Sequence, residues 1–337
     1  MRILIAGLGA IGQRHARNLR AVAGTDLELF AYRRRRRSFV VTETLSRDDS
    51  IDVERALSLT AFGDLDEALG VRPDAVFICT PSSEHVALAQ RVADAGCHLF
   101  IEKPISHTLE GVERLRQTTS ARRLIVLVGC QWRYHPRVRW LRGLLESGAL
   151  GGLRQAEFEY QEYLPDWHPY EDYRESYAAR AALGGGVVLT QIHDYDLAWW
   201  LFGPLRGVIA TGGHLSDLEI DVEDTVDASF DGPVPVRIKQ TFARRPPRRL
   251  IRVEGTRGSV HVDLLSAAVH VEGDVVSPPA LGDYRRNEMF VEEARHFLGC
   301  VAGGERPAVP LDDGIQVLRV ALAVKEALGS GHQVEIT

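Results

Sequence analysis

Short apolar runs alternate with segments of helical spacing along the first third of the chain. Apolar residues at every third or fourth position predict helices, whereas short continuous apolar runs predict buried strands. The predicted strands are Arg2–Ala6, Leu27–Tyr32, Ala75–Cys79, His98–Ile101 and Leu124–Cys130, and the predicted helices are Ile11–Val22, Glu84–Ala95 and Leu109–Thr119. Strands that alternate with helices form right-handed βαβ units around a parallel sheet. We therefore predict a doubly wound parallel sheet in residues 1–125.

The pattern changes beyond about residue 131. Stretches that alternate between apolar and polar residues are separated by glycine and proline, which is typical of antiparallel strands. The predicted strands are Gly152–Tyr163, Val208–His214, Thr225–Phe230, Val234–Phe242, Arg249–Leu265 and Gln333–Ile336, and the predicted helices are Gln191–Leu201, Glu288–Ala302 and Gly314–Leu328. We therefore expect residues 126–337 to form an α+β domain with a mainly antiparallel sheet, in a chain of the α/β class.

The composition excludes several classes of protein. The chain has 337 residues, enough for two domains, and a formal net charge of −6. A protein whose whole surface holds nucleic acid would be basic, so we expect no nucleic-acid partner. No apolar run approaches the roughly 18 residues of a membrane span, and the glycine-rich N-terminus is unlike a signal peptide. The four cysteines are scattered without metal-ligand spacing, so we expect reduced thiols, no metal site and a cytoplasmic protein without a membrane partner.

A glycine motif lies between the first predicted strand and helix. "ILIAGLGAIG" carries Gly7, Gly9 and Gly12, which would permit a tight turn, close approach of a pyrophosphate and close packing of helix on strand. We predict that these glycines, together with Ala10 and Ile11 at the helix N-terminus, bind a dinucleotide. The alternative is an ordinary turn between a strand and a helix.

Five consecutive arginines follow the second predicted strand, in "LFAYRRRRRS". Such a run can also be a nuclear import signal, a polyanion patch or a solvated loop. NAD-binding domains usually place an acid here for the ribose hydroxyls, and this strand ends without one. A guanidinium suits a 2′-phosphate. We therefore predict that Arg33 and Arg34 favour NADP(H), with NAD(H) still possible, and that Arg35–Arg37 lie in solvent.

Two further segments follow predicted strand ends, where open α/β sheets bind their ligands. "ICTPSSEH" contains Thr80, Pro81 and His85, and "LFIEKPISHT" contains the Glu-Lys-Pro tripeptide Glu102–Pro104. Together with the glycine motif, and with "GGGVVLTQIHDYD" and "WWLFG" later in the chain, they occur in order over most of the sequence. This ordered set resembles the glucose–fructose oxidoreductase, inositol dehydrogenase and MocA family.

The resemblance implies a large open sheet in the second domain, which often joins family members into a homodimer or homotetramer. It also implies that Thr80, Pro81, His85, Glu102 and Lys103 contribute to the cofactor site. Lys103 would lie where nicotinamide and substrate meet. A lysine in a partly buried cleft can donate a hydrogen bond to the reacting oxygen and can exchange a proton. The alternative is a surface charge at a strand end.

The resemblance gives His193 the role of proton donor or acceptor. The family commonly has an aspartate before this histidine, and the corresponding residue here is Thr190. We expect both residues to contact the substrate. A histidine without a carboxylate partner is less firmly oriented and less easily protonated. Asp194 or Asp196 could replace the missing acid, although Asp196 could instead brace the helix, and His193 itself could be a structural residue at a helix start.

Other candidate substrate contacts come from two segments. "CQWRYHP" contains Arg133, Tyr134 and His135, and in the family this segment commonly touches substrate. The stretch 158–186 is rich in aromatic residues, among them Trp167 and Tyr177. Aromatic rings pack on the apolar faces of sugars. The alternative for this stretch is a loop that packs on a neighbouring domain or subunit.

These features predict an NADP(H)-preferring oxidoreductase. Hydride would pass to or from a hydroxyl or keto carbon of a sugar, a sugar nucleotide or a cyclitol, in a polysaccharide or natural-product pathway. His193 would exchange the hydroxyl proton while Lys103 polarises the same oxygen. One rival is a redox-assisted glycosidase that keeps its cofactor bound, and another is a non-catalytic NADP(H)-binding regulator, for which Thr190 leaves some room.

Overall fold

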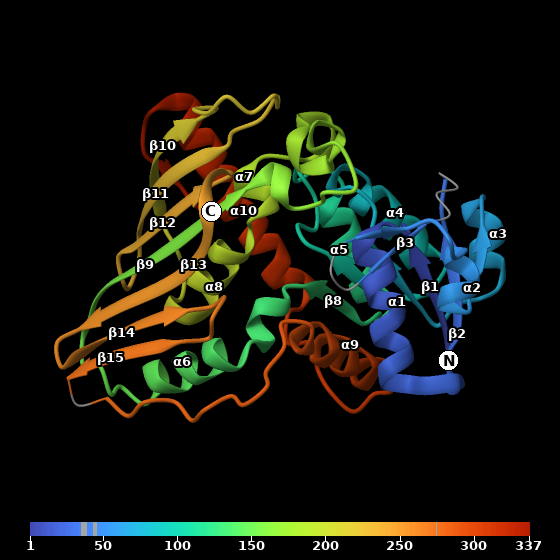
Figure 1. The fold of residues 1–337 in the computed structure, drawn as a ribbon, viewed down its shortest axis with the longest axis horizontal. Coiled ribbons are helices and arrows are strands. Elements are labelled where there is room, and N and C mark those ends of the chain that lie inside the picture. Colours follow the sequence, from blue (N-terminus) through green and yellow to red (C-terminus); the bar gives the residue numbers. More distant parts are fainter. Residues whose placement is uncertain (35–38, 43–45, 274) are drawn as a thin grey trace. The chain divides into compact units, whose positions relative to one another are not determined.

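A computed structural model describes residues 1–34, 39–42, 46–273 and 275–337. These residues form two compact units (Figure 1). The first unit contains residues 1–130, 168–172 and 286–315, and the second contains residues 131–167, 173–285 and 316–337. The chain therefore leaves the first unit and returns to it twice. No helix of the described residues is long and apolar enough to cross a membrane.

The first unit contains a six-stranded sheet. Its strands are β1 (Arg2–Ala6), β2 (Glu28–Tyr32), β5 (Thr60–Phe62), β6 (Ala75–Ile78), β7 (His98–Glu102) and β8 (Val126–Gly129), and its helices include α1 (Ala10–Ala23), α2 (Val53–Leu57), α3 (Leu65–Gly70), α4 (His85–Asp94), α5 (Val112–Ala121) and α9 (Glu288–Val301). All neighbouring strands are parallel, in the order β5-β2-β1-β6-β7-β8. Strand order of this kind defines the doubly wound dinucleotide-binding fold, so the predicted fold class is confirmed.

The apolar runs of this unit are buried because helices cover both faces of a parallel sheet. Phe77 of β6 stacks on Phe100 of β7 with ring centroids 4.4 Å apart. Phe297 of α9 meets both rings edge-on, at 5.2 and 5.7 Å. Helix α9 also packs on α1, which Figure 1 shows as a red helix beside a blue one. A segment late in the sequence thus completes the core of the N-terminal sheet.

The second unit contains an eight-stranded sheet. Its strands are β9 (Leu153–Tyr163), β10 (Gly207–Gly213), β11 (Thr225–Asp231), β12 (Val236–Thr241), β13 (Ala243–Gly255), β14 (Gly258–Asp263), β15 (Val269–Gly273) and β16 (Val334–Glu335), and its helices include α6 (Pro136–Glu146), α7 (Val187–Thr190), α8 (His193–Phe202) and most of α10 (Leu311–Ser330). The order is β15-β14-β13-β9-β12-β11-β10-β16, and only β9 and β12 pair in parallel. The predicted mainly antiparallel sheet is confirmed, although the stretch 249–265 is a hairpin of two strands rather than one strand.

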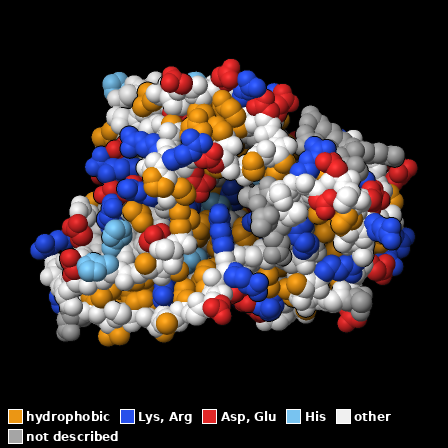
Figure 2. Space-filling model, in the orientation of Figure 1, with side chains coloured by type: hydrophobic (Ala, Val, Ile, Leu, Met, Phe, Trp, Pro, Cys, Tyr) orange, Lys and Arg blue, Asp and Glu red, His pale blue; other side chains and the backbone are white. Residues whose placement is uncertain are grey.

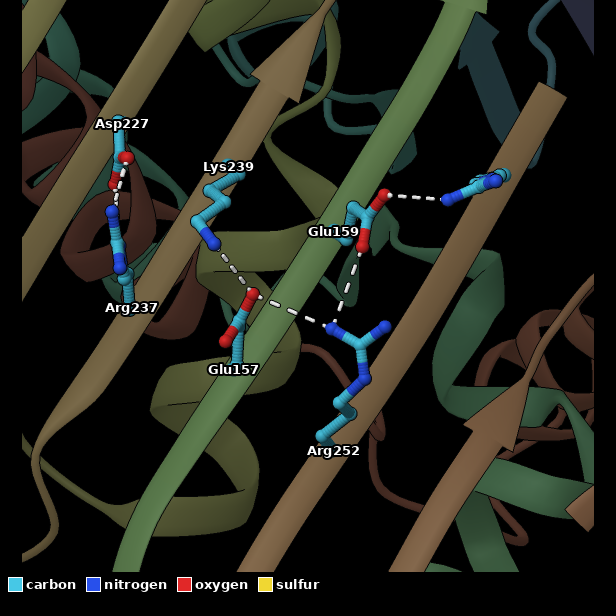
Figure 3. A network of polar contacts seen from close by, with 7 residues as sticks. Glu157, Glu159, Asp227, Arg237, Lys239 and Arg252 are labelled. Carbon is cyan, nitrogen blue, oxygen red and sulfur yellow. Dashed lines mark hydrogen bonds and ion pairs between the residues drawn. The ribbon is translucent and has the colours of Figure 1, made fainter. Parts of the chain in front are cut away.

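Side chains of the large sheet alternate between an apolar face and a charged face. Phe158, Ile238 and Val253 are buried on one face. At the positions that alternate with these along each strand, charged residues point to the other face and form ion pairs between adjacent strands. Figure 3 shows this network. We call the face that carries them the charged face; it includes Glu157, Glu159, Asp227, Arg237, Lys239, Arg248 and Arg252. Figure 2 shows side chains of both signs mixed over this part of the surface.

Candidate active site

The glycine motif forms a tight loop between β1 and α1. Gly7 has a positive φ of 100°, and a Cβ atom there would lie 2.6 Å from the carbonyl oxygen of Cys79. A Cβ atom on Gly12 would lie 2.0 Å from the carbonyl oxygen of Gly7. The corresponding direction at Gly9 is open, with no heavy atom within 4 Å among the described residues. The loop therefore has room for a pyrophosphate beside the first N–H groups of α1, at Ala10 and Ile11, so these residues fit a dinucleotide.

The predicted arginines begin where β2 ends. The Arg33 side chain is 11% exposed and forms an ion pair with Glu54 of α2. Arg34 is 63% exposed and pairs with Glu84. Both arginines thus lie beside carboxylates. Glu54 comes from a segment with no predicted site residue, and Glu84 comes from the motif "ICTPSSEH", where no contact with an arginine was predicted. Arg35–Arg37 lie outside the described residues.

His85 braces two loops at the ends of β6 and β7. Its Nδ1 atom lies 2.8 Å from the carbonyl oxygen of Pro104, and its Nε2 atom lies 2.8 Å from that of Thr80. Burial lowers the pKa of His85, although both carbonyl oxygens favour the charged ring. Pro81 continues the loop, and the Thr80 hydroxyl has no hydrogen-bond partner among the described residues, which leaves it able to bind a ligand.

Glu102 and Lys103 follow at the end of β7. Glu102 is buried, and its Oε1 atom lies 2.8 Å from Nε2 of His15 on α1. The backbone N–H of Lys103 donates to Oε2 of Glu102 at 3.2 Å, and Lys103 itself is half-buried. His15 was not among the predicted site residues, and its only signal in the sequence is a histidine three residues after Gly12. Strands β1, β6 and β7 are consecutive in the sheet, so the glycine loop, Thr80 and Lys103 share the carboxyl edge where such sheets bind ligands.

In the second unit, His193 is the first residue of α8 and is buried. Its Nε2 atom lies 3.4 Å from Nε2 of Gln131. Thr190, the last residue of α7, is also buried. A neutral amide thus lies beside the ring of the predicted proton-transfer residue.

The two acids next to His193 bind arginines instead. Asp194 accepts hydrogen bonds from Arg249 at 3.1 Å and from Gln240 at 2.8 Å. Asp196 accepts three hydrogen bonds from Arg133, at 2.5, 3.0 and 3.1 Å. Burial raises the pKa of Asp194, and Arg249 and Gln240 oppose this shift. These buried pairs support the start of α8, in agreement with the bracing role considered for Asp196.

The remaining candidate substrate residues have identifiable contacts. Arg133 is bound to Asp196, and its guanidinium lies 5.3 Å from the ring centroid of Trp200. His135 is the N-cap of α6, where its Nδ1 atom accepts from the backbone N–H of Arg137. Tyr134 is buried, and its ring lies 5.1 Å below the guanidinium of Arg139.

The aromatic stretch is divided between the units. Trp167 belongs to the second unit and meets the ring of Phe242 edge-on at 5.1 Å, while Tyr177 is half-buried in a short 3₁₀ turn. Tyr170 belongs to the first unit, where its ring lies 6.0 Å from that of Phe39. Part of this stretch therefore packs as a structural loop. No group of three or more potential metal ligands occurs in the part of the chain that the structure describes.

Two family models match the chain in sequence order. One describes an oxidoreductase family with an NAD-binding Rossmann fold and matches residues 1–130. The other describes the GFO/IDH/MocA C-terminal domain and matches residues 138–261. The chain belongs to the Gfo/Idh/MocA family of oxidoreductases. The resemblance noted in the sequence is confirmed, and the protein is an NAD(P)-dependent oxidoreductase.

Several relatives span the full chain. A myo-inositol 2-dehydrogenase of Thermotoga maritima is 28% identical and covers 100% of this chain and 98% of its own. A UDP-N-acetylglucosamine 3-dehydrogenase of Acidithiobacillus ferrooxidans is 28% identical, with 97% of each chain covered. Among solved structures, the WlbA dehydrogenase of Bordetella pertussis, in complex with NADH and UDP-GlcNAcA, has the same fold, with a TM-score of 0.83, 22% identity and coverage of 100% and 98%.

Proposed function

We propose that this oxidoreductase prefers NADP(H) and passes hydride to or from a hydroxyl or keto carbon of a sugar, a sugar nucleotide or a cyclitol. The main support is the common edge of β1, β6 and β7, which holds the glycine loop, the Thr80 hydroxyl and Lys103. The names of full-length relatives, which include inositol and sugar-nucleotide dehydrogenases, support the substrate class.

The chain would contribute positioning and proton transfer. The nicotinamide cofactor supplies or accepts the hydride. Lys103 would donate a hydrogen bond to the substrate oxygen and so stabilise the negative charge that develops on it. His193 would accept the hydroxyl proton during oxidation and return it during reduction. Asp194 and Asp196 are bound to arginines, and the neutral amide of Gln131 lies 3.4 Å from Nε2 of His193; a neutral imidazole at this position would accept the proton.

The cofactor preference is inferred from Arg33 and Arg34. A 2′-phosphate carries up to two negative charges and would compete with Glu54 and Glu84 for the two guanidinium groups. An arginine that exchanges its carboxylate partner for the phosphate still has an anionic partner. The ribose hydroxyl of NAD(H) could instead use Glu54, so the preference reflects a balance between these contacts.

Sugar nucleotides, polyols and cyclitols would be screened for NADPH or NADH formation in the wild-type protein and in Lys103→Met. Methionine keeps the length of the side chain and removes its donor. We expect turnover of the best substrate to fall by about a hundredfold or more, because the lysine contact forms mainly in the transition state, while NADPH affinity changes little. Full turnover in Lys103→Met would contradict the proposed role of the lysine.

We also propose that the second domain, predicted to span residues 126–337, joins subunits into a homodimer or homotetramer through the charged face of its sheet. The ion pairs between adjacent strands on that face offset its charges within one chain, which lowers the cost of covering it.

A further inference from the structure

A buried polar pair links the cofactor-binding helix to the strand that carries Lys103. His15 and Glu102 are 87 residues apart in sequence, and their Nε2 and Oε1 atoms are 2.8 Å apart. The side chains are 1% and 8% exposed. Burial of a carboxylate costs free energy unless a partner offsets the loss of hydration, so the buried Glu102 side chain needs a specific partner or role.

The surroundings of the pair are apolar and restrict its geometry. The His15 ring lies 5.2 Å from the ring of Phe77 and 4.9 Å from that of Phe100. Residue 129 is glycine, and a Cβ atom there would crowd the Glu102 carboxyl group at 3.3 Å. Burial disfavours the ionised form, yet the hydrogen bond from His15 and the nearby Lys103 charge hold the pKa of Glu102 below its ordinary value.

Each end of the pair adjoins a part of the proposed active site. His15 lies on α1, three residues after Gly12 of the pyrophosphate loop. Oε2 of Glu102 accepts the backbone N–H of Lys103 at 3.2 Å. The contacts therefore run from the dinucleotide helix through His15 and Glu102 to the backbone of Lys103, and each step is a hydrogen bond or a covalent connection within the first unit.

We propose that His15 is a positioning residue that holds Lys103, through Glu102, in register with the glycine loop. His15 and Glu102 would thereby fix the location of the lysine relative to the cofactor rather than contact substrate themselves. This inference rests on the proposed role of Lys103 in hydride transfer. Small displacements of a catalytic group are costly, because a hydrogen bond to the transition state depends strongly on distance and direction.

Two variants of similar polarity separate a positioning role from simple packing. His15→Gln places an amide N–H near the Nε2 position, whereas the shorter side chain of His15→Asn reaches only the Nδ1 position and loses Glu102. We expect His15→Asn to lower kcat about tenfold with little change in the Kd of NADPH, and His15→Gln to restore kcat to within about threefold of the wild type. Equal kcat values in the two variants, or a loss confined to NADPH binding, would overturn the proposal.

The decisive test repeats His15→Asn in a Lys103→Met background. If His15 acts through Lys103, the second substitution should lower kcat by less than twofold once the lysine is absent, because effects on a shared interaction are not additive. The same tenfold loss in both backgrounds would show that His15 acts independently of Lys103, and would overturn the inference even if Lys103→Met alone is strongly impaired. Undiminished turnover in Lys103→Met would instead contradict the proposed function. Thermal unfolding of each variant identifies losses that arise from a destabilised fold.

Discussion

The Arg33 side chain offers a direct test of cofactor preference, because it lies mostly buried at the end of β2. We expect the wild-type protein to bind NADPH at least tenfold more tightly than NADH, a difference of about 1.4 kcal/mol. Arg33→Asp should erase or reverse this ratio, since the carboxylate would repel the 2′-phosphate and could bind the ribose hydroxyls. Cofactor fluorescence titrations measure both constants. Arg34→Asp is a control with a smaller expected effect because Arg34 is largely exposed, and equal affinities in the wild type would refute the preference.

The contact between Gln131 and His193 leads to a prediction about pH. A carboxylate stabilises the imidazolium ion and raises the pKa of a histidine, whereas an amide does not. If neutral His193 accepts the proton in alcohol oxidation, Gln131→Glu should move the acidic limb of the kcat/KM profile upward by about one pH unit, or about 1.4 kcal/mol. Gln131→Met, which removes the contact without adding charge, should leave the limb in place. An unmoved limb in Gln131→Glu would assign proton transfer to another group.

His85, the first residue of α4, should make the stability of the first unit depend on pH. Burial depresses the pKa of His85, so the folded chain resists protonation of this ring at a pH where the unfolded chain accepts a proton. Stability should therefore fall as pH decreases below about 6.5, with a slope of at most about 1.4 kcal/mol per pH unit for one proton. His85→Gln removes this titration, so its loss of unfolding free energy between pH 7.5 and 5.5, measured by denaturant titration, should be smaller. Equal losses in both proteins would contradict this account.

Elements with a continuous apolar run were predictable, whereas elements of one or two turns were not. Strand β1 begins and ends at the predicted residues because its buried positions form an unbroken run. Helices α2 and α3 have five and six residues, too few to establish a helical period. Their signals are the N-cap residues Asp52 and Asp64, each of which accepts two backbone hydrogen bonds. The candidate site shows a similar contrast. Residues within short motifs could be predicted from the sequence, whereas the partners of Arg33, His193 and Glu102 could not, because they lie in distant segments.

At the scale of the whole molecule, the order of elements along the chain does not reveal which unit an element joins. The apolar stripe of α9 indicated a buried helix, and its position in the sequence suggested the second domain. The structure places it on α1, where Ala294 and Phe297 belong to the core of the first unit. A helix buries its apolar stripe against any sheet or helix of matching shape, so periodicity predicts burial without naming the partner.

The charged face of the large sheet gives the last prediction, on assembly. Eight strands spaced about 4.8 Å apart, with about seven residues each at 3.3 Å, cover roughly 900 Å², close to the 800 Å² per partner of a specific interface. Ile209 of β10 pairs with Ser229 of β11, which in turn pairs with Arg237 of the charged face. Ile209 therefore lies on this face, where it is 53% exposed.

Light scattering should therefore give a native mass of two or four chains. Ile209→Asp should shift the protein toward the monomer, because an unpaired carboxylate would be buried in the interface. Leu215→Asp is the matched control: Leu215 is 68% exposed but follows β10 outside the sheet, and its replacement should leave the mass unchanged. A monomeric wild-type protein would contradict assembly altogether. An oligomer that tolerates Ile209→Asp but dissociates in Leu215→Asp would place the interface beyond the charged face.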